Sequence, residues 1–182
     1  MIKEFSIRAI ATNTKARTAF SVCFFASFAV LAASTFLEHY SGVVGLIGLV
    51  LLVAAITLYT KYLSCSYYYE IVFDSEGTPL FLVNQLIGKR RTTLCRIGLF
   101  EIVKIECESS EEKKAHKTPS DVRKYNYVPT LFPDRVCRVY TVGQRERAEI
   151  LIEVSDEIAN LLSDYAREAR ELMRARRDEE YY

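Results

Sequence analysis

Three consecutive basic residues, Lys89, Arg90 and Arg91, follow Gly88 in a segment that is typical of a tight turn. Clustered Lys and Arg side chains neutralise phosphate charge, so this turn could contact the headgroups of anionic lipids. Residues 61–182 nevertheless hold 20 Lys and Arg against 21 Asp and Glu, so no broad positive field surrounds the cluster. A solvated turn is the alternative interpretation, and the same charge balance argues against nucleic-acid binding.

A second group of side chains could form a protein contact. It is aromatic and apolar, it flanks turn residues, and it consists of Tyr125, Tyr127, Leu131 and Phe132. Exposed aromatic residues are enriched in protein interfaces, so this group predicts a contact patch. The alternative is that the same side chains close the core of the domain.

Enzymatic chemistry has little support in this sequence. The chain contains no glycine-rich phosphate loop, no HExxH and no GxSxG. The acidic pairs Glu111–Glu112 and Glu179–Glu180 stand in polar segments, where we expect solvated charge rather than preorganised catalysis. We therefore expect no catalytic residue, no cofactor-binding residue and no small-molecule substrate.

The cysteines do not suggest a disulfide framework or a metal site. There are five, at positions 23, 65, 95, 107 and 137, and none forms a CxxC pair. An odd number without close spacing predicts reduced thiols in strands or in the core. His39 and His116 are isolated from them in sequence, so we expect no metal ligands.

Two uncharged apolar stretches, residues 19–37 and 41–60, dominate the first third of the chain. At about 1.5 Å per helical residue each covers roughly 30 Å, the thickness of the hydrocarbon core of a bilayer. As soluble core helices, two such stretches would leave almost nothing in the chain to cover them. They predict a transmembrane hairpin over residues 19–60. Cleavage of the first span as a signal peptide, near Ala33, is the alternative.

The distribution of basic residues predicts the orientation of this hairpin. The N-terminal tail, residues 1–18, carries Lys3, Arg8, Lys15 and Arg17, and Lys61 follows the second stretch. The connecting turn carries no Lys or Arg, so both termini are expected in the cytoplasm. Glycines at positions 42, 45 and 48 predict close packing of the two helices.

Residues 61–177 are long enough to form one domain with a core of its own. Runs rich in aromatic and β-branched residues, separated by turn clusters, predict strands. These runs are residues 66–74, 80–87, 92–97, 100–106, 125–130, 136–142 and 148–154. The polar segment 108–124 predicts a long loop. An apolar stripe from Ile158 to Leu172 predicts a C-terminal helix, which is expected to fray after Met173 and to end in a tail at residues 178–182.

This order of elements predicts an α+β domain, either an antiparallel barrel of the pleckstrin-homology (PH) type or a small open sheet covered by the helix. The double span, the segments LIGKRRTTL and FEIVKIE, and the final IEVSDEIANLL resemble the small bacterial membrane proteins with two N-terminal spans and a PH-like domain. The resemblance implies a multi-pass protein of the inner (plasma) membrane with its domain in the cytoplasm. Much of that group is functionally uncharacterised, so the resemblance implies an architecture and little chemistry.

From these features we expect a membrane-anchored, non-enzymatic scaffold or regulatory protein. Its expected partners are the bilayer, through the hairpin, and a protein of unknown identity, which includes a second copy of the chain. Two alternatives stay open. One is a sensor of anionic headgroups that uses residues 89–91 and the Arg-rich end of the helix. The other is an unrecognised enzyme, which would require a deep polar pocket with converging titratable groups.

Overall fold

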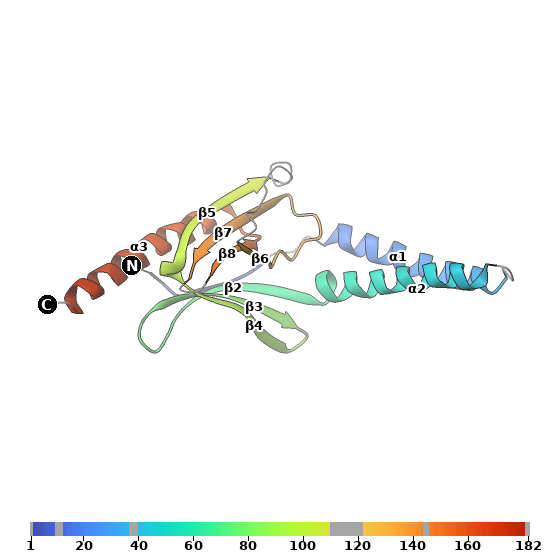
Figure 1. Ribbon diagram of the computed structural model, residues 1–182, viewed down its shortest axis with the longest axis horizontal. Helices are drawn as coiled ribbons and strands as arrows, with labels where there is room; N and C mark the ends of the chain where they lie inside the picture. The colour runs from blue at the N-terminus through green and yellow to red at the C-terminus, as the bar shows by residue number, and fades with distance from the viewer. Residues whose placement is uncertain (1, 10–12, 37–39, 110–121, 144–145, 181–182) are drawn as a thin grey trace. The chain divides into compact units, whose positions relative to one another are not determined.

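The computed structural model describes residues 2–9, 13–36, 40–109, 122–143 and 146–180. The chain divides into two compact units (Figure 1): a helical unit, Ala11–Cys65, and a sheet unit that combines Met1–Ile10 with Ser66–Tyr182. The helical unit is therefore inserted between the first strand of the sheet unit and the rest of it.

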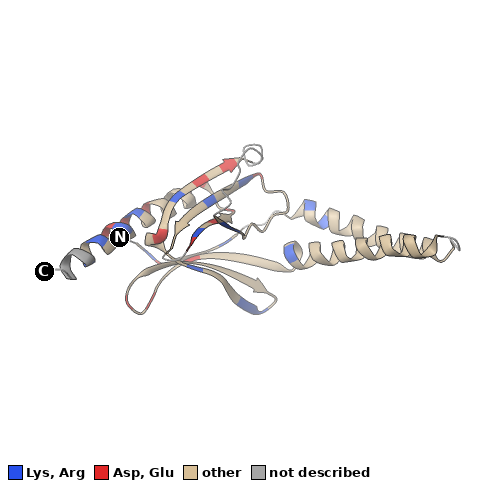
Figure 2. Ribbon diagram, viewed as in Figure 1, with Lys and Arg blue, Asp and Glu red and all other residues tan. Residues whose placement is uncertain are grey.

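The helical unit consists of two long apolar helices, as predicted. They are α1 (Thr14–Ser34) and α2 (Ser41–Leu58), and α2 continues into a π-helical turn, η1 (Tyr59–Leu63). Both are long and apolar enough to cross a membrane. Only 11% of the most apolar 18-residue stretch of each helix is buried, whereas the core helix of a soluble protein is mostly buried. Figure 2 shows that the described parts of these helices are uncharged between Arg17 and Lys61.

Of the three glycines of α2, Gly48 lies closest to α1. A Cβ atom on this residue would lie 2.7 Å from Leu31 Cγ, so a larger side chain would push the helices apart. The same Cβ on Gly42 would meet no atom within 4 Å, and on Gly45 it would meet only Ser34 Oγ at 3.9 Å. Of the three glycines expected at the contact, Gly48 is the one that the packing requires.

The first sheet has the strand order β1-β2-β3-β4. Its strands are β1 (Phe5–Arg8), β2 (Cys65–Phe73), β3 (Pro79–Ile87) and β4 (Arg90–Gly98). Strand β1 pairs antiparallel with β2, with Arg8 opposite Tyr68. The prediction of residues 1–18 as a tail was therefore wrong, because residues 5–8 form a strand and α1 begins at Thr14. The alternation in FSIR is too short to identify a strand by itself, and β1 is ordered by pairing with a strand that begins 57 residues after Arg8.

The second sheet has the order β5-β7-β8-β6. A short 3-10 turn, η2 (Leu99–Glu101), leads into β5 (Ile102–Ser109), and the other strands are β6 (Arg123–Asn126), β7 (Arg135–Val142) and β8 (Arg147–Ile152). Strands β5, β7 and β8 are antiparallel neighbours, as expected, but β6 runs parallel to β8. No hairpin joins β6 to β8, so its direction is set by the longer connections on either side of it.

Each of the seven predicted strands overlaps a strand of the structure, but the run 125–130 does so only at residues 125–126, and the run 100–106 begins in η2. The described strands form two separate sheets rather than one closed barrel. The result is an α+β arrangement of two four-stranded sheets and a helix. Of the loop predicted at 108–124, residues 110–121 lie outside the described residues. Of the flanking residues, 108–109 belong to β5 and 123–124 belong to β6.

The two sheets are joined through the buried Tyr69 of β2. Its hydroxyl donates a hydrogen bond to the Tyr127 carbonyl oxygen at 3.0 Å and accepts one from the Glu153 amide at 3.2 Å. Its ring stacks on Phe81 with the ring centroids 6.4 Å apart. Burial raises the pKa of this phenol, so Tyr69 acts as a neutral link between the sheets.

The C-terminal helix α3 (Asp156–Glu180) lies against η2 and β5 (Figure 1). Its buried residues include Leu162, Ala166 and Ala169, which continue the predicted apolar stripe. The helix does not fray at Met173 but extends to Glu180, because Arg, Ala and Glu favour helix even where no apolar face remains. The predicted tail at 178–182 is thus largely helical up to Glu180.

Candidate functional site

Both connections to the helical unit leave the sheet unit at one end, which we call the tethered end. The Ala9 amide donates a hydrogen bond to the Tyr67 carbonyl oxygen at 2.9 Å, so the chain leaving β1 lies beside the chain entering β2. Strands β2 and β3 form an antiparallel hairpin that is closed at residues 74–78. The far end of β3, with the β3–β4 turn, therefore lies at the tethered end (Figure 1).

The predicted basic cluster lies at the β3–β4 turn, but it is not one site. Gly88 has a φ of +60°, a left-handed conformation that favours glycine, and it presents Lys89 and Arg90 as exposed residues. Arg91 instead forms an ion pair with Glu70 of β2, whose side chain is buried. Arg91, although its side chain is 52% exposed, is thus paired with β2 across the intervening β3, whereas Lys89 and Arg90 are the cations at the tip of the turn.

A hydrogen-bond network surrounds the Glu70 carboxylate. Asn84 Nδ2 donates to Glu70 Oε2 at 2.8 Å, and Thr93 Oγ1 donates to Asn84 Oδ1 at 2.7 Å. The Ser6 hydroxyl of β1 donates to the other carboxylate oxygen. Because Glu70 and its partners together come from all four strands, the network stabilises the first sheet and explains why Arg91 is held there.

Apolar side chains are also exposed at the tethered end. Ile87 is 50% exposed beside the β3–β4 turn, and Phe132 is 61% exposed in the loop between β6 and β7. A cleft of about 430 Å³ is lined both by the end of β1 at Arg8 and by Asp134 and Arg135, which follow Phe132 closely. The cleft shows that the loop carrying Phe132 lies at the tethered end.

Tyr125 and Tyr127 lie elsewhere. Their rings stack with an interplanar angle of 8° and centroids 6.3 Å apart, and they line a groove of about 280 Å³ between the two sheets. The facing wall is β4, an edge strand of the first sheet, through Leu94 and Cys95. The predicted protein-contact group is therefore split, with Phe132 and the half-buried Leu131 in one loop and the two tyrosines in this groove.

Two titratable side chains of the groove are partly removed from water. Burial, with a smaller contribution from the charge on Glu101, raises the pKa of the Cys95 thiol to about 11. Burial also raises the pKa of the Tyr127 phenol to about 12. The Tyr127 hydroxyl donates to the Leu94 carbonyl oxygen at 3.3 Å, so it covers part of the edge of β4. Cys95 and Tyr127 are therefore uncharged near neutral pH, and they line the groove together with the charged residues Arg96, Glu101 and Glu146.

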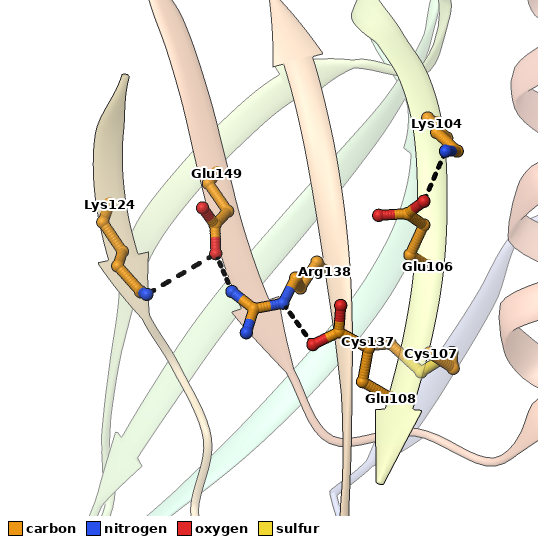
Figure 3. A network of polar contacts seen from close by, with 8 residues as sticks. All are labelled: Lys104, Glu106, Cys107, Glu108, Lys124, Cys137, Arg138 and Glu149. Carbon is orange, nitrogen blue, oxygen red and sulfur yellow. Dashed lines mark hydrogen bonds and ion pairs between the residues drawn. A yellow bond between two sulfur atoms is a disulfide. The ribbon is translucent and has the colours of Figure 1, made fainter. Parts of the chain in front are cut away.

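A buried charge network, which the sequence analysis missed, lies in the second sheet (Figure 3). Arg138 of β7 is 1% exposed; its Nε donates to Glu108 Oε2 at 2.8 Å, and it forms an ion pair with the fully buried Glu149 of β8. Lys124 Nζ of β6 lies 3.6 Å from Glu149 Oε1. Burial by itself lowers the pKa of Arg138, but the two carboxylates raise it by more, so the guanidinium stays charged. The sequence contained a sign of this network, because Arg138 and Glu149 stand within the otherwise apolar runs VCRVYTV and AEILIEV.

The prediction of reduced thiols was wrong for one pair. Cys107 of β5 and Cys137 of β7 stand directly opposite each other and form a disulfide, with their Cα atoms 4.0 Å apart. Spacing could not reveal it, because the pairing of β5 with β7 crosses a long connection. Cys23, Cys65 and Cys95 are free thiols.

The two histidines cannot be placed in a metal site. His39 and His116 lie outside the described residues. Within the described ranges, no group of three or more His, Cys, Asp or Glu residues is arranged to hold a metal ion.

The Arg-rich end of α3 does not join the tethered end. Arg170 Nη1 donates to the Val103 carbonyl oxygen at 3.4 Å, and Arg176 Nη1 to the Glu76 carbonyl oxygen at 3.5 Å. Glu76 belongs to the turn between β2 and β3, which is at the opposite end of that hairpin from Lys89. Residues 89–91 and this end of the helix therefore do not form one surface for lipid headgroups.

Comparison of the chain with models of protein families, with curated proteins and with solved structures gave no match.

Proposed function

We propose that this protein is a non-enzymatic, membrane-anchored interaction protein whose sheet unit is held against an anionic bilayer surface at its tethered end. In this proposal α1 and α2 cross the membrane as a hairpin. The pairing of β1 with β2 supports an even number of crossings, because both strands must lie on one side. The basic residues that flank the two helices support the cytoplasmic side, at the inner membrane.

The observation that carries the proposal is the short covalent connection at the tethered end. Only Ser64 separates η1 from β2, and one residue spans at most about 3.5 Å. If α2 crosses the bilayer, the start of β2 therefore lies at the headgroup layer. The β3–β4 turn and the loop carrying Phe132 share this end.

The side chains at this end suit an anionic lipid surface. Lys89 and Arg90 supply positive charge, and each basic residue near such a surface contributes about 1 kcal/mol of attraction. Ile87 and Phe132 supply apolar area that could enter the interface between headgroups and acyl chains. Lipid contact is thus favoured over a merely solvated turn. The PH-like character of the sheet unit remains part of the proposal, supported by two sheets followed by a C-terminal helix.

A tryptophan reporter tests this proposal, because the chain contains no Trp. The full chain with Phe132→Trp is reconstituted in lipid nanodiscs that contain or lack anionic lipid. We expect blue-shifted emission in anionic discs, quenched by lipids brominated near the headgroup. The matched control is Phe73→Trp, because Phe73 is 39% exposed at the far end of β2. Equal emission and quenching at both positions would contradict the proposal.

The basic pair is tested with the same reporter. Replacing Lys89 and Arg90 with Gln is expected to reduce the quenching in anionic discs, and added salt is expected to have the same effect. The control replaces two exposed residues of α3, Arg167 and Arg174, with Gln, which removes the same charge elsewhere. An equal loss in both double variants would show that net charge, and not the turn, is responsible.

Docking of a partner protein is a second candidate function. The groove beside Tyr125 and Tyr127 is bordered by an edge strand, and edge strands bind extended segments of other chains. A photo-crosslinking residue at Leu94, used in intact cells, is expected to give a discrete protein adduct. The same residue at Leu161, on α3, is the control, because both leucines are 38% exposed. Identical adducts from both positions would reject the groove as the docking surface.

A further inference from the structure

We propose that the Cys107–Cys137 disulfide is a reversible, redox-responsive bond that latches the edge strand β5 onto β7. The bond joins the outermost strand of the second sheet to its neighbour. The inference rests on the cytoplasmic side proposed above, where glutathione and thioredoxin systems keep ordinary thiols reduced. The two strands hold the two cysteines face to face, which favours the disulfide, whereas the compartment favours the two reduced thiols. The pair can therefore change between these two states.

The two sulfur atoms differ in access. Cys107 is half-buried on the edge strand, whereas Cys137 is 1% exposed. A thiolate of a dithiol reductant therefore attacks Cys107 Sγ, the bond between the two sulfur atoms breaks, and Cys137 leaves as a thiolate that takes up a proton. The second thiol of the reductant then displaces Cys107, so the pair gains two electrons and two protons while the dithiol becomes a disulfide. A disulfide oxidant reverses both steps.

The charge network on the opposite face keeps the two strands in register when the bond is open. Glu108 follows Cys107 and Arg138 follows Cys137, so their side chains point away from the sulfur atoms (Figure 3). The bond from Arg138 Nε to Glu108 crosses the same two strands, and Glu149, which also pairs with Lys124, holds the guanidinium from the other side. Arg138 and Glu108 are thus positioning residues for bond formation, because they keep the reduced thiols face to face.

Reduction is expected to release one end of β5 only. The disulfide lies near the end of the strand, which stops at Ser109. The beginning of β5 stays in contact with α3, where Arg170 donates to the Val103 carbonyl oxygen. Transient local opening of residues 107–109, after which the bond from Arg138 to Glu108 restores the register, is therefore the response that this geometry predicts, rather than unfolding of the sheet.

The test uses the full chain in nanodiscs, equilibrated in buffers with increasing ratios of dithiol to disulfide. Mass spectrometry after alkylation of the free thiols measures the redox state of Cys107 and Cys137. We expect both to change together, reversibly and without denaturant, with amide exchange at residues 107–109 increasing about 10-fold on reduction and β2 unchanged. A pair that resists oxidation, or that is reduced only after unfolding, would overturn the inference.

A variant separates positioning from simple stability. Glu108→Gln is expected to slow reoxidation of the pair about 10-fold, because the register of the two thiols is less well fixed. The matched control is Glu146→Gln, which removes an exposed carboxylate that pairs with Arg123. Equal reoxidation rates in the two variants would assign no positioning role to Glu108.

The orientation is tested separately with Ser75→Cys, an exposed position in the β2–β3 turn. In intact cells a membrane-impermeant maleimide is expected to label this thiol only after permeabilisation. Labelling from outside would overturn both the cytoplasmic orientation and a reversible bond. Internal labelling with a pair that never changes state would overturn the inference alone and leave the proposed function standing.

Discussion

Each of the two sheets buries a carboxylate, and they neutralise it in different ways. Glu70 in the first sheet pairs with Arg91, whose side chain is 52% exposed, and it also accepts hydrogen bonds from Ser6 and Asn84. Glu149 in the second sheet pairs with Arg138, and both side chains are buried. The first network can exchange a lost partner for water, whereas the second cannot, so equivalent substitutions should have unequal costs.

The largest effect is expected from Arg138→Met. It leaves Glu149 buried without the ion pair to Arg138 and removes the bond from Arg138 to Glu108, which should cost about 3–5 kcal/mol of unfolding free energy. Urea unfolding of the full chain in nanodiscs, followed by circular dichroism, measures this loss. Arg96→Met, at an exposed pair with Asp74, is the control. A loss of similar size in both variants would remove the distinction between the buried and the exposed pair.

A second effect belongs to the second sheet alone, because the disulfide cross-links it. Replacing both Cys107 and Cys137 with Ala removes a bond across a sequence separation of 30 residues, which should cost about 3 kcal/mol under oxidising conditions. In excess dithiol the wild-type disulfide is reduced as well, so the difference in unfolding free energy between the wild-type chain and the double variant should become much smaller. Thermal unfolding in both buffers measures it, and a penalty that does not depend on the buffer would indicate lost packing instead.

Arg91→Gln should have a smaller effect, about 1 kcal/mol, because the cation is half exposed and Glu70 keeps its other hydrogen bonds. The same urea titration measures it. A loss as large as that of Arg138→Met would contradict the comparison. An Asn84→Ala variant, which removes a fully buried partner, is then expected to cost more than Arg91→Gln.

The smallest effect is a pH dependence in the groove between the sheets. The folded state raises the pKa of Cys95 to about 11, so the unfolded chain loses this proton first as the pH rises. The thiol therefore contributes stability that is present below its ordinary pKa and is lost as the pH rises toward 11. Its alkylation rate should still be low at a pH where exposed thiols react fully. Reaction of Cys95 at the rate of an exposed thiol would contradict this assignment.

The sequence predicted the long apolar helices and seven strands because their patterns are local. Continuous apolar runs and alternating residues, as in the segment FEIVKIE, need no information from the rest of the chain. Strand β1 was missed because its order comes from a partner on the other side of the helical unit. Long-range pairing is the part of the fold that a local pattern does not contain.

The candidate sites were predicted less completely, for the same reason. Lys89, Arg90 and Arg91 are adjacent in sequence, but strand alternation and the neighbouring Glu70 separate Arg91 from the other two. Tyr127 and Phe132 are five residues apart, yet the loop between β6 and β7 carries them to different surfaces. The disulfide and the network around Arg138 depend on the register of β5, β7 and β8, which the sequence alone did not specify.

The insertion of the helical unit between β1 and β2 also sets an order of events during synthesis. Residues 5–8 are made before either apolar helix, and their partner strand is made after both. Completion of the first sheet therefore has to wait until the hairpin has been synthesised. If only one of the two helices crosses the bilayer, β1 and β2 lie on opposite sides of it. Glu70 then lacks the hydrogen bond from the Ser6 hydroxyl. On the proposed topology the four-residue strand would therefore act as an assembly checkpoint, because β1 could pair with β2 only after both helices had crossed the bilayer.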